Sequence, residues 1–443
     1  MKRIVASIGV AALGAACVPS SIAQGAVDAS KPWTLSLALR GFYDDNVSTT
    51  KTGKVDTFGG EISPTVAFAL PLDQTTVSLI YTYDYKYYDK RPDPTSDHND
   101  QSHTIAASLM HSFSERTTIS ISDSFVIGQE PDVLRSGPDY ASFQRISGDN
   151  IRNFGHVVLN HQFTPKFGVE IGYANSLFDY EDEDFGVQTL LGFPIGVNPI
   201  SRSGILDRIE HMIHADARWM LKPTTVGLIG YAFSLDSYTA DQPIGVVNVV
   251  SPFSLPNNTL IYSDARDNRA HYVYAGAEHT FVPGLHGSLR VGARFTDYFN
   301  SPLNESGTTP YVSASLNYDL AKDSSLAVGL SHDLSATDAF STSPNGGSIT
   351  SDSESTVVYA SLTHRILPNL TGTLMGQFQN SAFNGGRLDS HDEQYYLFSA
   401  ALEYHINRHV SASLSYHYDL LESDVPNRGF DRNRVFLGAT FTY

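Results

Sequence analysis

Histidine is the residue type whose spacing first suggests chemistry in this chain. His111, His161, His279 and His364 each stand two residues before Phe or Ile, just ahead of a short turn-like segment. Imidazoles bind metal ions, but a site needs several of them to converge on one ion. These four fall in separate, distant segments, so we expect an interfacial role for them and no metal site. Trp219, Tyr318 and Tyr404 occupy the same position in other segments.

Motifs of catalysis are missing from the sequence. It has no Gly-x-Ser-x-Gly elbow, no His-Glu-x-x-His pair and no phosphate-binding loop. His111 and Ser114 could supply a base and a nucleophile, but no third partner is evident. The acidic run 181–184 lacks the spaced ligands and glycine of a calcium loop. We therefore expect neither enzymatic activity nor a cofactor or bound metal.

The first residues read as an export signal. Lys2 and Arg3 precede a short apolar stretch, and Ser21 and Ala23 offer small side chains at the −3 and −1 positions for cleavage after Ala23. We expect a signal peptide at 1–23, a short periplasmic segment at 24–32 and one folded unit at 33–443. Lipidation of Cys17 is the alternative, although Gly14 fits that motif poorly. Cys17 is the only cysteine, so we expect no disulfide in the mature chain.

Alternation with period two dominates the rest of the chain. Between residues 410 and 420, every second residue from Val410 to Leu420 is apolar, whereas Ser411 to Asp419 supply a polar series. Successive side chains of a strand point to opposite faces, so each strand has one apolar and one polar face. Asp123 breaks the rule, because it falls on an apolar face beside Phe125.

The lengths of the connections indicate whether the apolar faces pack in a protein core or contact membrane lipid. Eight short turns, the first near 72–74 and the last near 407–409, alternate with nine longer connections between residues 47 and 431. Short periplasmic turns with long outer loops are typical of outer-membrane barrels. We predict an all-β fold, a single closed antiparallel transmembrane β-barrel of about 18 strands in a bacterial outer membrane. The net charge of −18 argues against nucleic acid as a partner. Lipid and lipopolysaccharide are the expected surroundings.

In such a barrel the polar faces line the lumen. Charges of both signs fall on these faces, and Glu278 and Arg290 are placed to pair diagonally across a turn. We expect them to be mutually compensating charges, with a dedicated binding site as the alternative. The lumen-lining candidates are Arg40, Glu61, Asp84, Lys86, Glu170, Arg218, Glu278, Arg290, Arg294, Glu403 and Asp419.

Two connections are unusually apolar for solvated loops, namely 185–200 and 244–262. We hypothesise that they fold over or into the mouth and narrow it. The alternative is that they extend the strands as a packed ribbon above the membrane. The candidate constricting residues are Phe185, Leu190, Leu191, Phe193, Val249 and Phe253.

The two ends of the folded unit carry recognisable elements. Val435, Leu437, Phe441 and Tyr443 share one face of the last strand, which resembles the C-terminal signal read by the barrel assembly machinery. Near the start stands Gly41-Phe42-Tyr43-Asp44-Asp45-Asn46. With the alternation that follows, this element resembles the putative β-barrel porin 2 family. The resemblance implies an outer-membrane barrel with a porin or export role, and it implies no catalytic residues.

We therefore expect a passive pore for small hydrophilic solutes. An alternative is a conduit for exopolysaccharide export, with polysaccharide as the partner. Another is a structural or adhesive barrel whose lumen is blocked.

Overall fold

The computed structural model describes residues 32–92, 97–128, 132–134, 144–146, 149–190, 193–249, 257–301, 305–342 and 348–443. The predicted signal peptide with Cys17, and residues 24–31 after it, lie outside this part. Within the described ranges, no helix is both long and apolar enough to cross a membrane.

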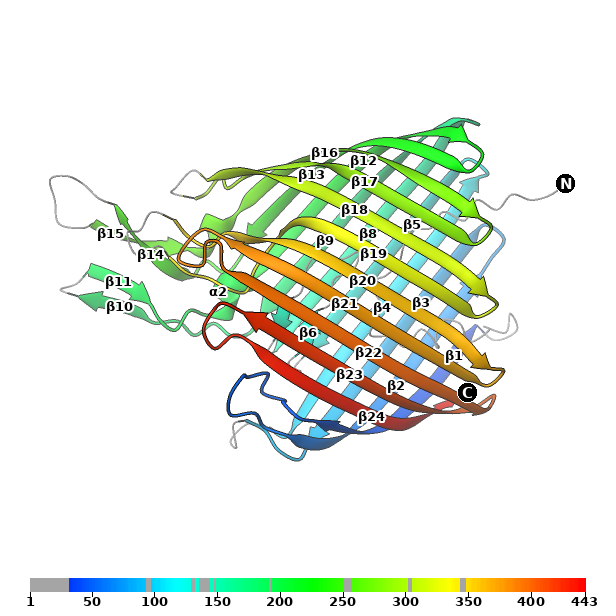
Figure 1. The fold of residues 1–443 in the computed structure, drawn as a ribbon, viewed down its shortest axis with the longest axis horizontal. Coiled ribbons are helices and arrows are strands. Elements are labelled where there is room, and N and C mark those ends of the chain that lie inside the picture. Colours follow the sequence, from blue (N-terminus) through cyan, green and yellow to red (C-terminus); the bar gives the residue numbers. More distant parts are fainter. Residues whose placement is uncertain are drawn as a thin grey trace.

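Eighteen antiparallel strands form one closed sheet (Figure 1). Each strand pairs with the next along the barrel, and the last strand pairs with the first through nine residue pairs from Ser36↔Thr442 to Asp44↔Arg434. The predicted fold is therefore confirmed. The barrel strands are β1 (Trp33–Asp44), β2 (Thr57–Pro71), β3 (Thr75–Tyr88), β4 (Asn99–Ser114), β5 (Thr117–Gly128), β8 (Asn150–Thr164), β9 (Phe167–Tyr180), β12 (Arg208–Lys222), β13 (Thr225–Tyr238), β16 (Asn268–Val282), β17 (Leu285–Asp297), β18 (Ser306–Ala321), β19 (Ser324–Ser335), β20 (Asp352–Leu367), β21 (Leu370–Asn384), β22 (Asp392–Asn407), β23 (Val410–Ser423) and β24 (Phe430–Thr442).

The short turns and the long loops lie at opposite ends of the barrel, as the connection lengths predict. Turns such as Pro165-Lys166 and Pro283-Gly284 join strands at one end, where the C-terminus also lies (Figure 1). The nine long connections emerge at the other end. We refer to these ends as periplasmic and outer, following the pattern of outer-membrane barrels.

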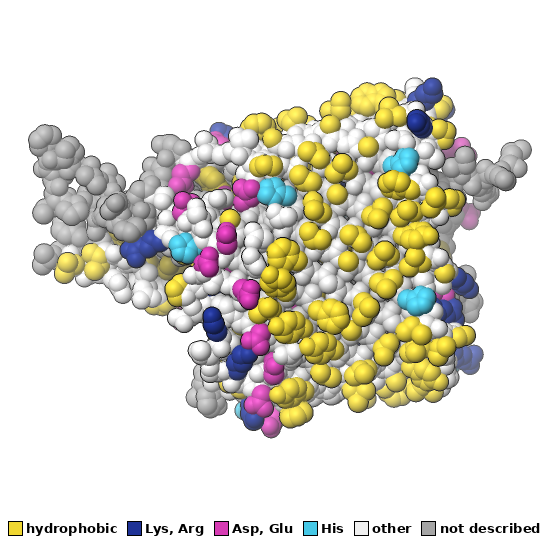
Figure 2. All heavy atoms as spheres, viewed as in Figure 1, with side chains coloured by type: hydrophobic (Ala, Val, Ile, Leu, Met, Phe, Trp, Pro, Cys, Tyr) yellow, Lys and Arg dark blue, Asp and Glu magenta, His cyan; other side chains and the backbone are white. Residues whose placement is uncertain are grey.

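The apolar face of each strand is the exposed one. On β1, Leu35, Leu37 and Leu39 are exposed, whereas Ala38 and Phe42 between and beyond them are buried. Figure 2 shows the result as a belt of hydrophobic side chains around the wall on the face of β16–β24. A soluble sandwich would bury these side chains between two sheets, but a closed barrel presents them to lipid.

Cross-strand polar pairs mark the outer edge of this belt. Tyr81 on β3, Tyr173 on β9 and Tyr231 on β13 are each the seventh residue of their strand. Their hydroxyls hydrogen-bond the Nδ1 atoms of imidazoles on the next strand, at 2.7–2.9 Å. We call these imidazoles the outer girdle; they belong to His103, His211 and His271.

The loops at the outer end carry secondary structure of their own. They contain the hairpins β6 (Asp132–Leu134) with β7 (Gln144–Ile146), β10 (Val187–Leu190) with β11 (Phe193–Val197), and β14 (Pro243–Val249) with β15 (Asn257–Tyr262). They also contain helix α2 (Arg202–Leu206) and the 3₁₀ helix η1 (Ser263–Arg266). In Figure 1, β10–β11 and β14–β15 extend away from the rim.

The element Asp44-Asp45-Asn46 has a structural role at the seam between β1 and β24. The Asp44 carboxylate accepts hydrogen bonds from Nε and Nη2 of Arg432, at 2.5–3.1 Å. Asp45 accepts from the backbone N–H and side-chain amide of Asn433 at 2.7 Å. The Asn46 amide donates to the Asp431 carbonyl at 2.8 Å. The last residue of β1 and the two residues that follow it thus clasp β24 at its outer end.

Candidate functional site: the lumen and its mouth

A chain of ion pairs lies on the inward face of four barrel strands. Arg218 of β12 donates to Glu170 of β9 at 2.8 Å and to Glu278 of β16 at 2.5 Å. Arg290 of β17 lies 4.0 Å from Glu278 and donates to Asp216 at 3.3 Å. The structure thus brings together four of the predicted lumen candidates, including the diagonal pair Glu278 and Arg290. Each charge has an opposite neighbour, so the wall is largely compensated.

The other predicted candidates form smaller groups. Arg40 donates to Glu61 at 2.6 Å, and Lys86 stands opposite Glu61 on β3. Arg294 lies 3.4 Å from Asp333 of β19.

Asp419 accepts from Arg434 and from the Tyr395 hydroxyl, both at 2.9 Å. Asp84 and Glu403 lie half-buried on β3 and β22. In the described ranges, no group of three or more His, Cys, Asp or Glu side chains could hold a metal ion.

Sequence reasoning missed the residue at the centre of the larger network. Asp216 is almost fully buried and accepts from the Tyr274 hydroxyl at 2.6 Å as well as from Arg290. It stands two residues before Arg218, so strand parity alone could have placed it on the same face. Tyr272 and Tyr311 also lie on this wall, with ring centroids 5.4 Å apart.

Large inward tyrosine rings can lie along the wall because the residue opposite each of them on the neighbouring strand is glycine, which leaves room for the ring. Gly230 stands opposite Tyr274, and a Cβ atom at Gly230 would overlap the Tyr274 ring and the Asp216 carboxylate. Gly329 stands opposite Tyr359 in the same relation. A ring lying flat over a glycine occupies little of the lumen. Farther toward the periplasmic end, the inward Met110 is 55% exposed, so solvent reaches the interior at that level.

Several outer loops pack together at the mouth. Arg266 of η1 is fully buried and donates to the carbonyls of Ile205 at 2.7 Å, Thr337 at 3.0 Å and Ser351 at 3.2 Å. These acceptors belong to the loops before β12 and before β20. Burial lowers the pKa of Arg266 below its ordinary value. One side chain therefore ties three loops into a single assembly.

Helix α2 packs against one wall at the mouth. Leu206 packs against Phe154, Phe178 and Tyr180, where β8 and β9 reach the rim. Asp207 follows directly and accepts the Tyr180 N–H at 2.8 Å. Burial raises the pKa of Asp207 to about 7.

A second tie crosses the rim from the loop before β24. Arg428 pairs with Asp338 and, at 2.7 Å, with Glu393. These carboxylates raise the pKa of Arg428 above its ordinary value, against the effect of burial. The loop before β20 is thus held at both of its sides, by Arg266 and by Arg428.

Two of the candidate constricting residues, Phe185 and Leu190, have side chains that the structure describes. Phe185 and Leu190 are exposed, and the hairpin β10–β11 that carries Leu190 extends beyond the rim (Figure 1). Narrowing of the mouth by this set of residues stays a prediction, with the packed ribbon as its alternative. Leu191 and Phe253 lie outside the described residues. Phe193 and Val249 belong to β11 and β14.

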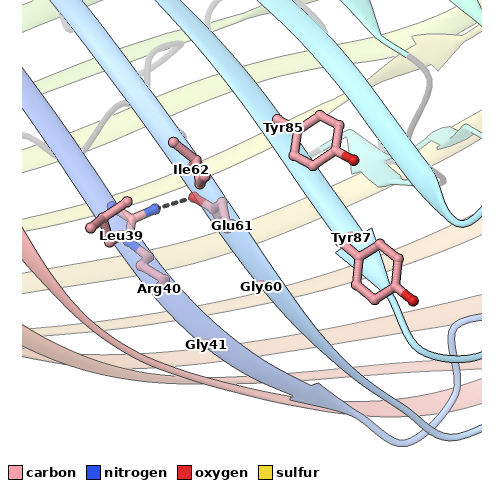
Figure 3. Close-up of a pocket in the computed structure, with 8 residues that line it drawn as sticks. All are labelled: Leu39, Arg40, Gly41, Gly60, Glu61, Ile62, Tyr85 and Tyr87. Carbon is pink, nitrogen blue, oxygen red and sulfur yellow. Dashed lines mark hydrogen bonds and ion pairs between the residues drawn. The ribbon is translucent and has the colours of Figure 1, made fainter.

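A shallow recess of about 420 Å³ lies in the wall near the outer end of β1–β3 (Figure 3). Gly41 and Gly60 stand opposite each other there, with Leu39, Ile62 and Tyr87 around them. The Arg40–Glu61 pair lies beside it. Since the exposed side chains of this recess belong to the lipid-facing series, it is not part of the lumen site.

The C-terminal residues lie on the exposed face of β24. Val435, Leu437, Phe441 and Tyr443 are all exposed, and the Tyr443 ring lies 5.9 Å from that of Trp33. Recognition of this face by the assembly machinery stays a prediction.

Comparison with known proteins supports the sequence resemblance for the second half of the barrel. Residues 257–443 match the family model described as putative β-barrel porin 2. The matched region contains the nine strands β16–β24. The element around Asp44 lies outside it.

Solved structures of similar fold include several porins of low sequence identity. They are the outer membrane protein opdK from Pseudomonas aeruginosa (12% identity, TM-score 0.42) and a BenF-like porin from Pseudomonas fluorescens Pf-5 (12%, 0.45). OccAB4 from Acinetobacter baumannii is a third (12%, 0.41). In each case the alignment covers 93% of this chain and 99% of the other. No curated protein matches the chain in sequence.

Proposed function

We propose that the barrel is a passive outer-membrane channel for small hydrophilic solutes. The observation that carries this proposal is the inward face itself. It is lined by polar and charged groups, and its large rings lie flat over glycines such as Gly230 and Gly329. Eighteen strands spaced about 4.8 Å apart and tilted by about 40° give a wall roughly 35 Å across, wide enough for water.

The balance of lumen charges favours cations mildly. Six of the eleven sequence-predicted candidates are acidic and five are basic. Asp216, Asp236 and Asp333 add further carboxylates to the wall from β12 to β19. A pore with an acidic excess concentrates cations, although compensated pairs keep the preference small.

Planar-bilayer recording tests the proposal directly. The purified barrel should give single-channel steps whose current is proportional to voltage. In a KCl gradient, its reversal potential should be small and should have the sign expected for a cation-selective channel. Glu278→Gln should reduce that potential, and Glu115→Gln, in an exposed periplasmic turn, should leave it unchanged. A barrel that inserts but shows no conductance would mean a blocked lumen and would refute a diffusion role.

Liposome swelling distinguishes the remaining alternatives. Entry of neutral sugars should slow steadily from pentoses to trisaccharides if solutes diffuse through a fixed aperture. Equal rates for long oligosaccharides would favour the export conduit instead.

A further inference from the structure

The periplasmic edge of the lipid-facing wall carries one structural unit four times. An imidazole stands three residues before the end of β4, β8, β16 and β20. In each case its Nδ1 atom hydrogen-bonds a hydroxyl on the first residue of the preceding strand, at 2.7–3.0 Å. The pairs are Thr75–His111, Thr117–His161, Thr225–His279 and Ser324–His364. We call these four imidazoles the periplasmic girdle.

Each of these hydrogen bonds can form in two ways, with either the hydroxyl or the Nδ1–H group as the donor. When a hydroxyl donates to Nδ1, the ring proton of the neutral imidazole stays on Nε2, which then becomes a donor. Three of the rings are also held edge-on against an exposed Phe two residues later, at centroid distances of 4.5–4.6 Å. In the tautomer whose Nδ1 atom accepts, each imidazole presents an oriented Nε2–H donor, and in three of the units an exposed Phe ring lies beside it.

Basic side chains accompany these units at the turns. Exposed lysines and arginines stand at or next to six of the eight periplasmic turns, and one of them, Arg365, pairs with Asp323. They are Arg116, Lys166, Lys222, Lys322, Arg365 and Arg408. In Figure 2, Lys, Arg and His side chains lie at this margin of the apolar belt, whereas most of the visible carboxylates lie at the opposite margin, together with further Lys, Arg and His side chains.

The spacing of the two girdles places each at a membrane surface. His103 and His111 on β4, and His271 and His279 on β16, are eight residues apart. Eight residues rise roughly 20 Å along the membrane normal in a strand tilted by about 40°. That span is close to the height of the apolar band of an outer-membrane barrel, so the periplasmic girdle lies at the headgroup level of the inner leaflet.

We propose that the periplasmic girdle and the neighbouring lysines and arginines bind the phosphate groups of anionic phospholipids in the inner leaflet. The Nε2–H group and a basic side chain donate to phosphate oxygens. The acyl chains run along the apolar belt on the membrane side of the imidazoles, where Leu109 and Leu159 precede them by two residues. The occupant is lipid because the unit recurs on strands spread around the wall. A second copy of the chain would cover one sector only.

Mixed micelles with defined phospholipids test this with the full barrel. Phosphatidylglycerol should raise the midpoint of thermal unfolding more than phosphatidylcholine does. A variant with His111, His161, His279 and His364 all changed to Leu should lose at least half of this difference. The matched control changes His103, His211 and His271 to Leu at the outer girdle and should keep it. Equal losses in the two variants would overturn the proposal.

Three further arms separate the possible explanations. Inorganic phosphate at the same concentration should give no comparable shift, and an equal shift would mean an anion site without lipid. A variant that combines Thr75→Val, Thr117→Val and Thr225→Val keeps the imidazoles but removes the hydroxyls that hold three of them in place. The stabilisation by phosphatidylglycerol should then fall partway toward that of the variant with the four His changed to Leu. Lys166→Gln alone should weaken phosphatidylglycerol binding up to roughly fivefold, the contribution of one basic residue near an anionic surface. Full retention in both variants would overturn the proposal.

Discussion

The seam between β1 and β24 gives the sharpest test of the structure. Arg432 and Asp44 have side chains that are only 1% and 2% exposed, and they pair through three hydrogen bonds. Arg432→Met removes one partner and leaves the Asp44 carboxylate buried without its cation. Breaking a buried ion pair in this way costs about 3–5 kcal/mol of unfolding free energy.

An exposed ion pair on the same barrel supplies the matched control. Arg365 and Asp323 are 38% and 44% exposed, and Arg365→Met makes the same chemical change there. Surface pairs contribute about 0–1 kcal/mol. The double variant Asp44→Asn with Arg432→Met should recover at least half of the loss, because no unpaired charge remains.

Urea unfolding in lipid vesicles measures these free energies. The two tryptophans, Trp33 and Trp219, lie on the lipid-facing side and report the loss of the barrel by fluorescence. Equal losses of unfolding free energy in Arg432→Met and Arg365→Met would refute the argument that burial makes the Asp44–Arg432 pair the more stabilising of the two. A double variant no more stable than Arg432→Met would refute the charge argument as well.

Three further outcomes follow from the mouth and the wall. Asp207 has a pKa raised to about 7, so its neutral form is favoured in the folded loops. The stability of these loops, measured by limited proteolysis, should therefore fall as pH rises from 5 to 8. Asp207→Asn should make it less dependent on pH. Gly230→Val should push the Tyr274 ring into the lumen and lower single-channel conductance, whereas Gly307→Val, where a Cβ meets nothing within 4 Å, should not. Deleting 185–200 should leave conductance unchanged, because β10–β11 extends beyond the rim; a clear rise would instead support the constriction hypothesis.

The strand count and the two faces of the wall could be predicted from sequence because period two and connection length are local properties. Glu278 and Arg290 could be paired from sequence because they flank one short turn. The other ion-pair partners could not be predicted, because they depend on the register of strands farther apart in the chain. Arg218 meets both Glu170 and Glu278, which lie 48 and 60 residues away. Asp44 and Arg432 are 388 residues apart and meet only because the barrel closes.

The packing of the outer loops could be predicted even less, because no periodic pattern in the sequence marks which charged residue of a loop is buried. Arg266 resembles any arginine of a polar loop, yet it is fully buried and donates to carbonyls of two other connections. The apolar character of 185–200 was visible, but its direction was not, since a ribbon above the rim and a segment across the mouth bury the same residue types.

Asp123 shows that a departure from alternation can itself follow a rule. It is the seventh residue of β5, the position held by Tyr81, Tyr173 and Tyr231 on their strands. Those tyrosines bond an imidazole on the next strand, and Asp123 instead accepts from the Asn153 amide at 3.1 Å. The acid and the amide therefore replace a tyrosine and a histidine together, at the outer edge of the belt where water and headgroups reduce the cost of a charge.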